Sequence, residues 1–235
     1  MIWAVVPAAG SGRRFGAAIP KQYAQIDGCS VLERTLRRLA EVRRIRGLMV
    51  VLAASDRDWP GLQQVGGKPV LTAVGGAERA DSVLAGLRAL PETVALTDYV
   101  LVHDAARPCV RTADIERLID QVLGSTGGLL AAPVRDTLKR EAEPDQALDQ
   151  VRVAHTVTRT GLWRALTPQM FRRGGLTLAL ESAHAQGLRP TDEAQAMEMQ
   201  GVHPLLVEAA EDNVKVTTSH DLLLAQFLLR AQDDE

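Results

Sequence analysis

The residues best suited to chemistry form a glycine-rich turn near the N-terminus. The turn comprises Pro7, Ala8, Ala9, Gly10, Ser11 and Gly12, followed by Arg13 and Arg14. Glycine has no Cβ and tolerates positive φ, so Gly10 and Gly12 let the backbone turn tightly and approach a ligand. Successive backbone N–H groups of such a turn can face a phosphate. Arg14 and Lys21 belong to a group of three cations in positions 13–21 with no acid among them, which favours phosphate binding over a purely structural turn.

Two better-known phosphate motifs do not fit this turn. A dinucleotide-binding Gly-x-Gly-x-x-Gly needs a third glycine where Phe15 stands, and the Gly-Lys-Ser/Thr of a P-loop occurs nowhere in the chain. The remaining interpretation is a triphosphate cradle with its own cations. Arg14 and Lys21 are then candidates for stabilising negative charge in a transition state.

A second candidate site follows the apolar run Tyr99–Val102, where Asp104 lies beside His103 and close to Arg107. A carboxylate at the carboxyl end of a buried strand can hold Mg²⁺ or a substrate hydroxyl. Arg107 can pair with Asp104, and a buried structural Asp–Arg pair is an equally weighted alternative. We interpret His103 as a packed histidine at the end of a strand, because no Gly-x-Ser-x-Gly motif accompanies it.

Buried strands and amphipathic helices alternate along the chain and predict how these residues are positioned. Near-continuous apolar runs at Ile2–Val6, Leu48–Ala54, Tyr99–Val102 and Leu129–Val134 are typical of parallel strands buried on both faces. Helical periodicity follows a capping box at Ser30 and Glu33, recurs over residues 83–90, and is clearest over residues 115–123. The order predicts an α/β fold with a doubly wound, mostly parallel sheet in a single domain over residues 1–235.

The C-terminal third predicts further helices and one strand. We expect a helical stretch ending near Gly187, a short helix over Asp192–Met199 and a strand around Leu205–Val207. A last helix should start at a capping box formed by Thr218 and Asp221.

The segment from about 135 to 159 interrupts this alternation. A polar stretch is followed by Val151, Val153 and Val157, which alternate with more polar residues as in a β-strand. An excursion of this length is uncommon as a plain loop. It predicts a β-hairpin arm that pairs with a second subunit, or, with equal weight, a surface insertion.

Composition narrows the class of protein. Lys and Arg number 27 against 29 Asp and Glu, and the net charge of −2 argues against a nucleic-acid-binding protein. The chain has no apolar run long enough for a membrane helix and starts with no signal-like segment. Cys29 and Cys109 form no metal-binding or disulfide pattern, which favours the cytoplasm.

Six short motifs, in order along almost the whole chain, resemble those of the 2-C-methyl-D-erythritol 4-phosphate cytidylyltransferases. The first joins the glycine-rich turn to Pro20-Lys21-Gln22-Tyr23. The others are Gly75-Gly76-Ala77-Glu78-Arg79-Ala80-Asp81-Ser82-Val83, Val102-His103-Asp104-Ala105-Ala106-Arg107-Pro108, Ala132-Pro133-Val134-Arg135-Asp136-Thr137, Leu166-Thr167-Pro168-Gln169, and the pair Thr191-Asp192-Glu193-Ala194 and Asp212-Asn213-Val214-Lys215-Val216-Thr217. Ala77 departs from members that carry Asp beside the cytosine, a small loss if that contact is made by the backbone.

The resemblance implies a Rossmann-like nucleotidyltransferase fold and a homodimeric enzyme that uses CTP, a polyol phosphate and Mg²⁺ or another divalent cation. It implies catalytic roles for Arg14, Lys21, Arg159 and Lys215. Besides the turn and Lys21, it implies nucleotide contacts from Gly76, Ser82, Asp104 and Ala105. It implies acceptor contacts from Asp104, Arg107, Thr137, Arg159, Thr191 and Lys215. The arm would carry Thr137 and Arg159 to the site of the neighbouring subunit. Asp104 is the candidate metal ligand.

The reaction implied is attack of an acceptor phosphate oxygen on the α-phosphorus of CTP, with release of pyrophosphate. Two other functions remain open. A pentitol- or pentulose-phosphate cytidylyltransferase would share the nucleotide half and differ in the acceptor pocket. A non-catalytic nucleotide-binding regulator would bind CTP without forming pyrophosphate. A Rossmann oxidoreductase is disfavoured by Phe15 at the third glycine position.

Overall fold

The architecture is built on one mostly parallel sheet. The computed structural model describes residues 1–10, 19–143 and 150–233. Eight strands lie in the order β12-β8-β11-β7-β1-β4-β6-β5. Their bounds are β1 Ile2–Pro7, β4 Leu48–Leu52, β5 Gln64–Val65, β6 Lys68–Val74, β7 Tyr99–Val102, β8 Gly128–Pro133, β11 Trp163–Arg172 and β12 Leu205–Glu208. β11 runs antiparallel to β7 and β8, and the short β5 runs antiparallel to β6. The predicted α/β fold is confirmed, and so are its four buried strands.

The sheet is wound outward in both directions from β1. The chain passes from β1 to β4 and β6 on one side, then returns to β7, which pairs with β1 on the other side. The strand order therefore reverses between β1 and β7. In doubly wound sheets the carboxyl ends of the strands at such a switch point form the ligand-binding crevice.

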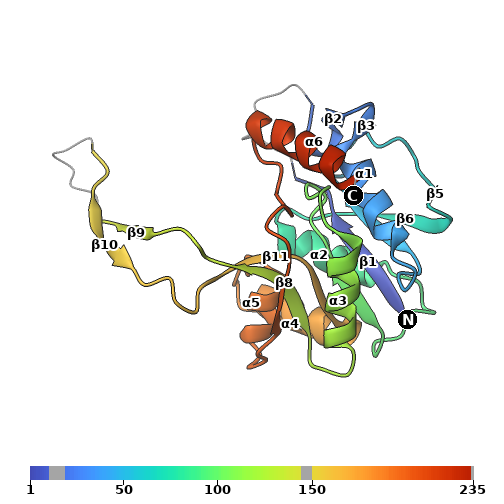
Figure 1. Ribbon diagram of the computed structural model, residues 1–235. Helices are drawn as coiled ribbons and strands as arrows, with labels where there is room; N and C mark the ends of the chain where they lie inside the picture. Colours follow the sequence, from blue (N-terminus) through green and yellow to red (C-terminus); the bar gives the residue numbers. More distant parts are fainter. Residues whose placement is uncertain (11–18, 144–149, 234–235) are drawn as a thin grey trace.

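Helices cover both faces of the sheet (Figure 1). α1 (Val31–Glu41) and α3 (Thr112–Val122) pack on one face, and α2 (Arg79–Arg88), α4 (Arg173–Ala185) and α5 (Glu193–Glu198) on the other. Alternation along β1 feeds the two cores, because Ala4 and Val6 belong to the first and Trp3 and Val5 to the second. The near-continuous apolar runs are thus explained by burial on both faces.

Local start signals of the helices are also present. The hydroxyl of Ser30 accepts the backbone N–H of Glu33 at 3.1 Å at the start of α1. At the start of α6 (Ser219–Asp233), Thr218 and Asp221 exchange the reciprocal hydrogen bonds of a capping box. α6 packs on a third small core that includes Ile26. This core adjoins the 3₁₀ helix η2 (Lys21–Tyr23) and the short hairpin of β2 (Gln25–Ile26) and β3 (Cys29–Ser30).

Of the strands longer than two residues in the described part of the chain, β6 and β11 were not predicted. β6 carries a single buried residue, Val70, and its short apolar stretch follows Pro69 and is divided by Thr72. α4 is the predicted helical stretch ending near Gly187, and β11 precedes it over Trp163–Arg172, where no strand was predicted. Its outer residues are exposed while residues 166–171 are buried, and Pro168 within it reads as a turn residue.

The predicted hairpin arm is present. β9 (Leu138–Glu141) and β10 (Val153–Val157) pair as an antiparallel two-stranded sheet of their own. Figure 1 shows this hairpin projecting far from the main body. Val151 and Val153 are 82% and 61% exposed. Of the helices in the described residues, none has the length and apolarity needed to cross a membrane.

Candidate active site

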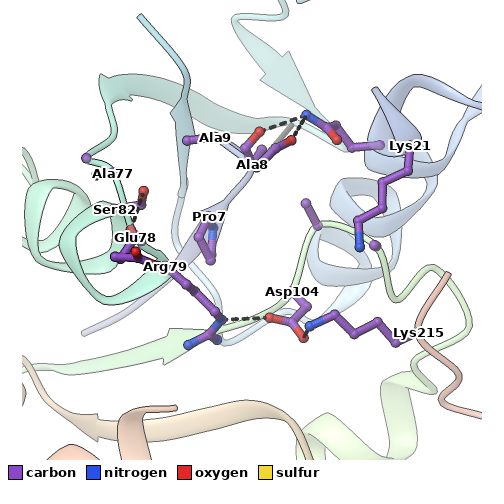
Figure 2. A pocket seen from close by; sticks show the side chains of 15 residues that line it. Pro7, Ala8, Ala9, Lys21, Ala77, Glu78, Arg79, Ser82, Asp104 and Lys215 are labelled. Carbon is purple, nitrogen blue, oxygen red and sulfur yellow. Dashed lines mark hydrogen bonds and ion pairs between the residues drawn. The ribbon is translucent and has the colours of Figure 1, made fainter. Parts of the chain in front are cut away.

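A pocket lies at the switch point, where β1 and β7 end. It brings together most of the predicted nucleotide-binding residues, namely Pro7, Ala8, Ala9, Gly10, Lys21, Gly76, Ser82, Asp104 and Ala105, with the predicted acceptor residue Lys215. Gln22, Ala77, Glu78, Arg79 and Ala106 complete the lining. Figure 2 shows Lys21, Arg79 and Lys215 converging on this pocket from different segments of the chain. The predicted Ser11, Gly12 and Arg14 lie outside the described residues.

The first half of the glycine-rich turn is braced by Gln22, which the sequence analysis did not assign to the site. Its buried amide Nε2 donates to the carbonyl oxygens of Ala8 at 2.9 Å and Gly10 at 3.3 Å. The N–H of Ala8 donates to the Val51 carbonyl at 2.7 Å, which continues the pairing of β1 with β4. One side chain thus ties the carbonyls of Ala8 and Gly10 together. Only the occurrence of Gln22 in the first family motif pointed to this role.

The turn before α2 is closed so tightly that two of its residues must be glycine. A Cβ on Gly76 would lie 2.4 Å from the Cβ of Asp81, and one on Gly75 would lie 2.7 Å from the Ser82 hydroxyl oxygen. Ser82 donates that hydroxyl to the Glu78 carbonyl at 3.1 Å. Residues 76–78 line one wall of the pocket, and Gly76 has no side chain to separate its backbone from a ligand.

Asp104 is the electrostatic centre of the pocket. Its Oδ1 lies 3.0 Å from Arg79 Nε, while its Oδ2 lies 2.9 Å from Lys215 Nζ and 3.3 Å from Arg107 Nε. Burial alone would raise the pKa of Asp104, but the charges of Arg79, Lys215 and Arg107 hold it well below its usual range. The carboxylate is thus charged, and the predicted Asp104–Arg107 pair is present.

His103 is a fully buried brace behind Asp104. Burial lowers its pKa to about 4, so the ring is neutral at pH 7. Its Nε2–H faces the carbonyl of Arg107 at 3.1 Å, which leaves Nδ1 to accept the hydroxyl of Thr167 at 2.9 Å. The Thr167 oxygen in turn accepts the N–H of Asp104 at 3.1 Å. His103 is therefore the packed strand-end histidine that we predicted, and it fixes both ends of the turn over residues 104–107.

The position of Lys215 is set by contacts remote in sequence. Arg107 donates to the Asn213 carbonyl at 2.7 Å, and the buried Asn213 amide donates to the Thr167 carbonyl at 2.8 Å. The N–H of Val216 bonds the Ala106 carbonyl at 2.8 Å. Arg107 stands behind the pocket rather than in its lining. These bonds hold the segment before α6 against the end of β7, and this places Lys215 beside Asp104.

Three predicted acceptor residues lie elsewhere in this chain. Thr137 immediately precedes β9, and Arg159 follows β10 by two residues, so both belong to the exposed arm. Thr191 is exposed just before α5, with its N–H on the Gln195 side chain at 2.6 Å. None of the three lines the pocket. Their assignment to an acceptor site stays a prediction.

A doubly wound sheet with a cation-lined pocket at its switch point defines a nucleotide-binding α/β protein, and the glycine turn followed by cations is of the nucleotidyltransferase type. Comparison with known proteins specifies the kind. The chain belongs to the 2-C-methyl-D-erythritol 4-phosphate cytidylyltransferase family, whose model matches residues 2–231.

Individual relatives agree along nearly the whole chain. The cytidylyltransferase of that name from Stenotrophomonas maltophilia is 55% identical over 231 residues, covering 97% of this chain and 96% of the relative. The one from Xanthomonas axonopodis pv. citri is 54% identical, and the match covers 99% of this chain and 85% of the relative. The crystal structure of the Francisella tularensis enzyme superposes with a TM-score of 0.81 at 31% identity, covering 97% and 99%. The crystal structure of the Thermus thermophilus enzyme superposes with a TM-score of 0.75 at 30% sequence identity. The match covers 97% of this chain and 98% of that one.

Proposed function

We propose that this chain transfers CMP from CTP to 2-C-methyl-D-erythritol 4-phosphate, which gives 4-diphosphocytidyl-2-C-methyl-D-erythritol and pyrophosphate. The observation that supports this most directly is the convergence of Lys21, Arg79 and Lys215 on a pocket walled by the glycine-rich turn. A ligand with several phosphates matches such a pocket, and membership of the family supports the choice of base and acceptor.

The chemistry asks for charge stabilisation rather than for a base. A phosphate monoester has its second pKa near ~6, so the acceptor is already largely a dianion at pH 7. One of its oxygens attacks the α-phosphorus, the bond to the β-phosphate bridging oxygen breaks, and that oxygen leaves with pyrophosphate. Negative charge gathers on the α-phosphoryl oxygens, where preorganised cations and N–H donors are most effective. We assign this role to Lys21 and Arg14.

The two substrates would occupy opposite ends of the pocket. The glycine-rich turn and the wall formed by Gly76 and Ser82 suit the nucleotide, because Gly10 and Gly76 leave their backbone groups open to a ligand. Lys215 and Asp104 suit the acceptor, since an ammonium can bind its phosphate and a carboxylate can accept from its hydroxyl groups. Positioning the acceptor in line with the α-phosphorus would supply much of the rate.

A divalent cation fits this site only in company with the nucleotide. In the part of the chain that the structure describes, no three His, Cys, Asp or Glu side chains come together as a metal site. Mg²⁺ is commonly held by one or two carboxylates together with substrate phosphates, so Asp104 can contribute one ligand. When bound, such an ion neutralises charge on the phosphates. Both oxygens of Asp104 already pair with cations, so the phosphates would supply most of the ligands.

We further propose a cytoplasmic homodimer in which the arm serves the neighbouring subunit. The arm is a two-stranded sheet with exposed valines, a form that seldom stands alone. A test is to mix Arg159→Ala and Lys21→Ala subunits. If Arg159 acts across the dimer, mixed dimers hold one intact site, and about a quarter of the wild-type activity returns. If it acts within its own subunit, mixing restores nothing.

The substrate assignment is tested by pyrophosphate release from CTP with a panel of polyol phosphates. We expect turnover with methylerythritol phosphate. Turnover with a pentitol phosphate but none with methylerythritol phosphate would establish the other cytidylyltransferase function instead. CTP binding with no pyrophosphate from any acceptor would favour the regulator.

A further inference from the structure

A buried ion-pair array joins the two halves of the pocket. Arg79 donates from Nη1 and Nη2 to the two carboxylate oxygens of Glu193 at 2.6 and 3.1 Å, and from Nε to Asp104 at 3.0 Å. The guanidinium is therefore held between two carboxylates, with Glu193 on its Nη1–Nη2 edge and Asp104 at its Nε. The Glu193 side chain is 1% exposed and does not line the pocket, so it reaches a ligand only through Arg79.

The two ends of this pair stand at functionally distinct places. Arg79 is the first residue of α2, directly after the nucleotide wall formed by residues 76–78. Glu193 is the first residue of α5, two residues after Thr191, which the family resemblance assigns to the acceptor. The pair thus bridges segments 114 residues apart, and Arg79 also binds Asp104, which follows the end of β7.

The Glu193 end of the pair is rigid. Asp192 caps α5 by accepting the Gln195 N–H at 2.9 Å. Gln169 of β11 binds the same turn twice, donating to Asp192 at 3.0 Å and accepting the Ala194 N–H at 2.7 Å. A carboxylate on such a support can fix the direction of a longer, partly exposed arginine.

Stability alone is a poor reason for the array. Buried ion pairs cost desolvation energy that their attraction often only offsets, and apolar residues of the same volume commonly do as well. Burial raises the pKa of Glu193, and Arg79 opposes that shift. Apolar residues would not place a fixed cation in the wall of the pocket. They would also not leave Asp104 with one oxygen, Oδ1, on Arg79 and the other, Oδ2, on Lys215.

We propose that Glu193 is a positioning residue which, through Arg79, holds the nucleotide wall and the acceptor segment in a fixed relation. The inference rests on the proposed function for what the two segments bind. Without Glu193, Arg79 would turn toward Asp104 or the phosphates, and the alignment of the two substrates would relax. Small misplacements of this kind can lower a rate by about 10²-fold.

The test is a kinetic comparison of Glu193→Gln with a matched control, Glu181→Gln. Glu181 also pairs with an α2 arginine, Arg88, at 2.7 Å, but Glu181 is 38% and Arg88 61% exposed, and neither lines the pocket. We expect Glu193→Gln to raise the KM of the acceptor and lower kcat/KM about 10- to 100-fold. The control should stay within about twofold of wild type. A merely structural residue would lower the active fraction and leave KM unchanged, which would overturn the proposal.

A double-mutant cycle shows whether the effect passes through Arg79. In an Arg79→Gln background, adding Glu193→Gln should change kcat/KM by less than about twofold. An equal loss in both backgrounds would refute the inference. Should Glu193→Gln not fold, Glu193→Asp keeps the charge and shortens the reach by one methylene, and an unchanged acceptor KM there would count against the role. If wild type prefers another polyol phosphate, the comparison is made with that acceptor, so a wrong substrate does not obscure the result.

Discussion

Replacing His103 by glutamine should weaken the fold and also remove part of its sensitivity to acid. His103 is 0% exposed, and both ring nitrogens have partners, in the Arg107 carbonyl and the Thr167 hydroxyl. Glutamine keeps an amide near one partner but cannot serve both. At pH 7.5 we expect a loss of about 1–3 kcal/mol in the free energy of unfolding, the usual effect of leaving a buried polar group unsatisfied.

The pH dependence follows from the burial of the ring. Burial lowers the pKa of His103 to about 4 in the folded chain, whereas an unfolded chain has about 6.5. Between these values the unfolded chain binds a proton that the folded chain does not, so stability is full above pH 6.5 and is lost as the pH falls. The loss in the wild type is about 2 kcal/mol between pH 7.5 and pH 5, and about 3 kcal/mol once the pH is below 4. The glutamine variant lacks this loss.

The assay is urea unfolding of both proteins at several values between pH 7.5 and pH 5. The difference in unfolding free energy between wild type and His103→Gln should shrink by about 2 kcal/mol over this range. A difference that stays constant would refute the buried neutral ring. If the variant does not fold, NMR of wild type answers the same question: the ring protons of His103 should not titrate between pH 8 and pH 5, and a midpoint near 6.5 would contradict the structure.

Three other substitutions test separate parts of the site by steady-state pyrophosphate release. Lys21→Ala should lower kcat about 10²- to 10³-fold, as does loss of a single oxyanion donor, and full turnover would remove Lys21 from the mechanism. Gly76→Ala places a methyl 2.4 Å from the Cβ of Asp81 and should raise the KM of CTP at least about tenfold, whereas Gly175→Ala, whose methyl meets no atom closer than 3.8 Å, should not. Lys215→Ala should raise the KM of the acceptor more than that of CTP. A larger rise in the KM of CTP would mean that the nucleotide, and not the acceptor, binds at Lys215.

The fold was largely predictable because its strongest signals are local. Ile2–Val6 and Tyr99–Val102 are apolar at every position, as strands buried on both faces must be, and Ser30 marks the start of α1 through a bond three residues away. β6 gave a weaker signal because Thr72 divides its short apolar stretch, which follows Pro69. β11 was missed because its antiparallel insertion between β7 and β8 depends on pairings with strands far along the chain.

The site was predictable only where it coincides with a local pattern. The glycine-rich turn is such a pattern, and its described part lies where the strand order reverses. The contacts of Glu193 with Arg79 and of Arg107 with Asn213 span 114 and 106 residues, and no spacing in the sequence encodes them. Lys215 came from family resemblance alone, since nothing around it distinguishes it from a surface lysine.

The arrangement around Asp104 explains how a site for polyanions can be built before its ligands arrive. Arg79, Arg107 and Lys215 come from different segments, and like charges at a few ångströms repel strongly in a partly buried site. Asp104 offsets that repulsion and holds the three side chains at one point. Because a substrate phosphate brings more negative charge than one carboxylate, it can attract Lys215 without dispersing the group. Under the proposed function the chain would need little reorganisation when the phosphates bind, which is the condition for effective charge stabilisation in the transition state.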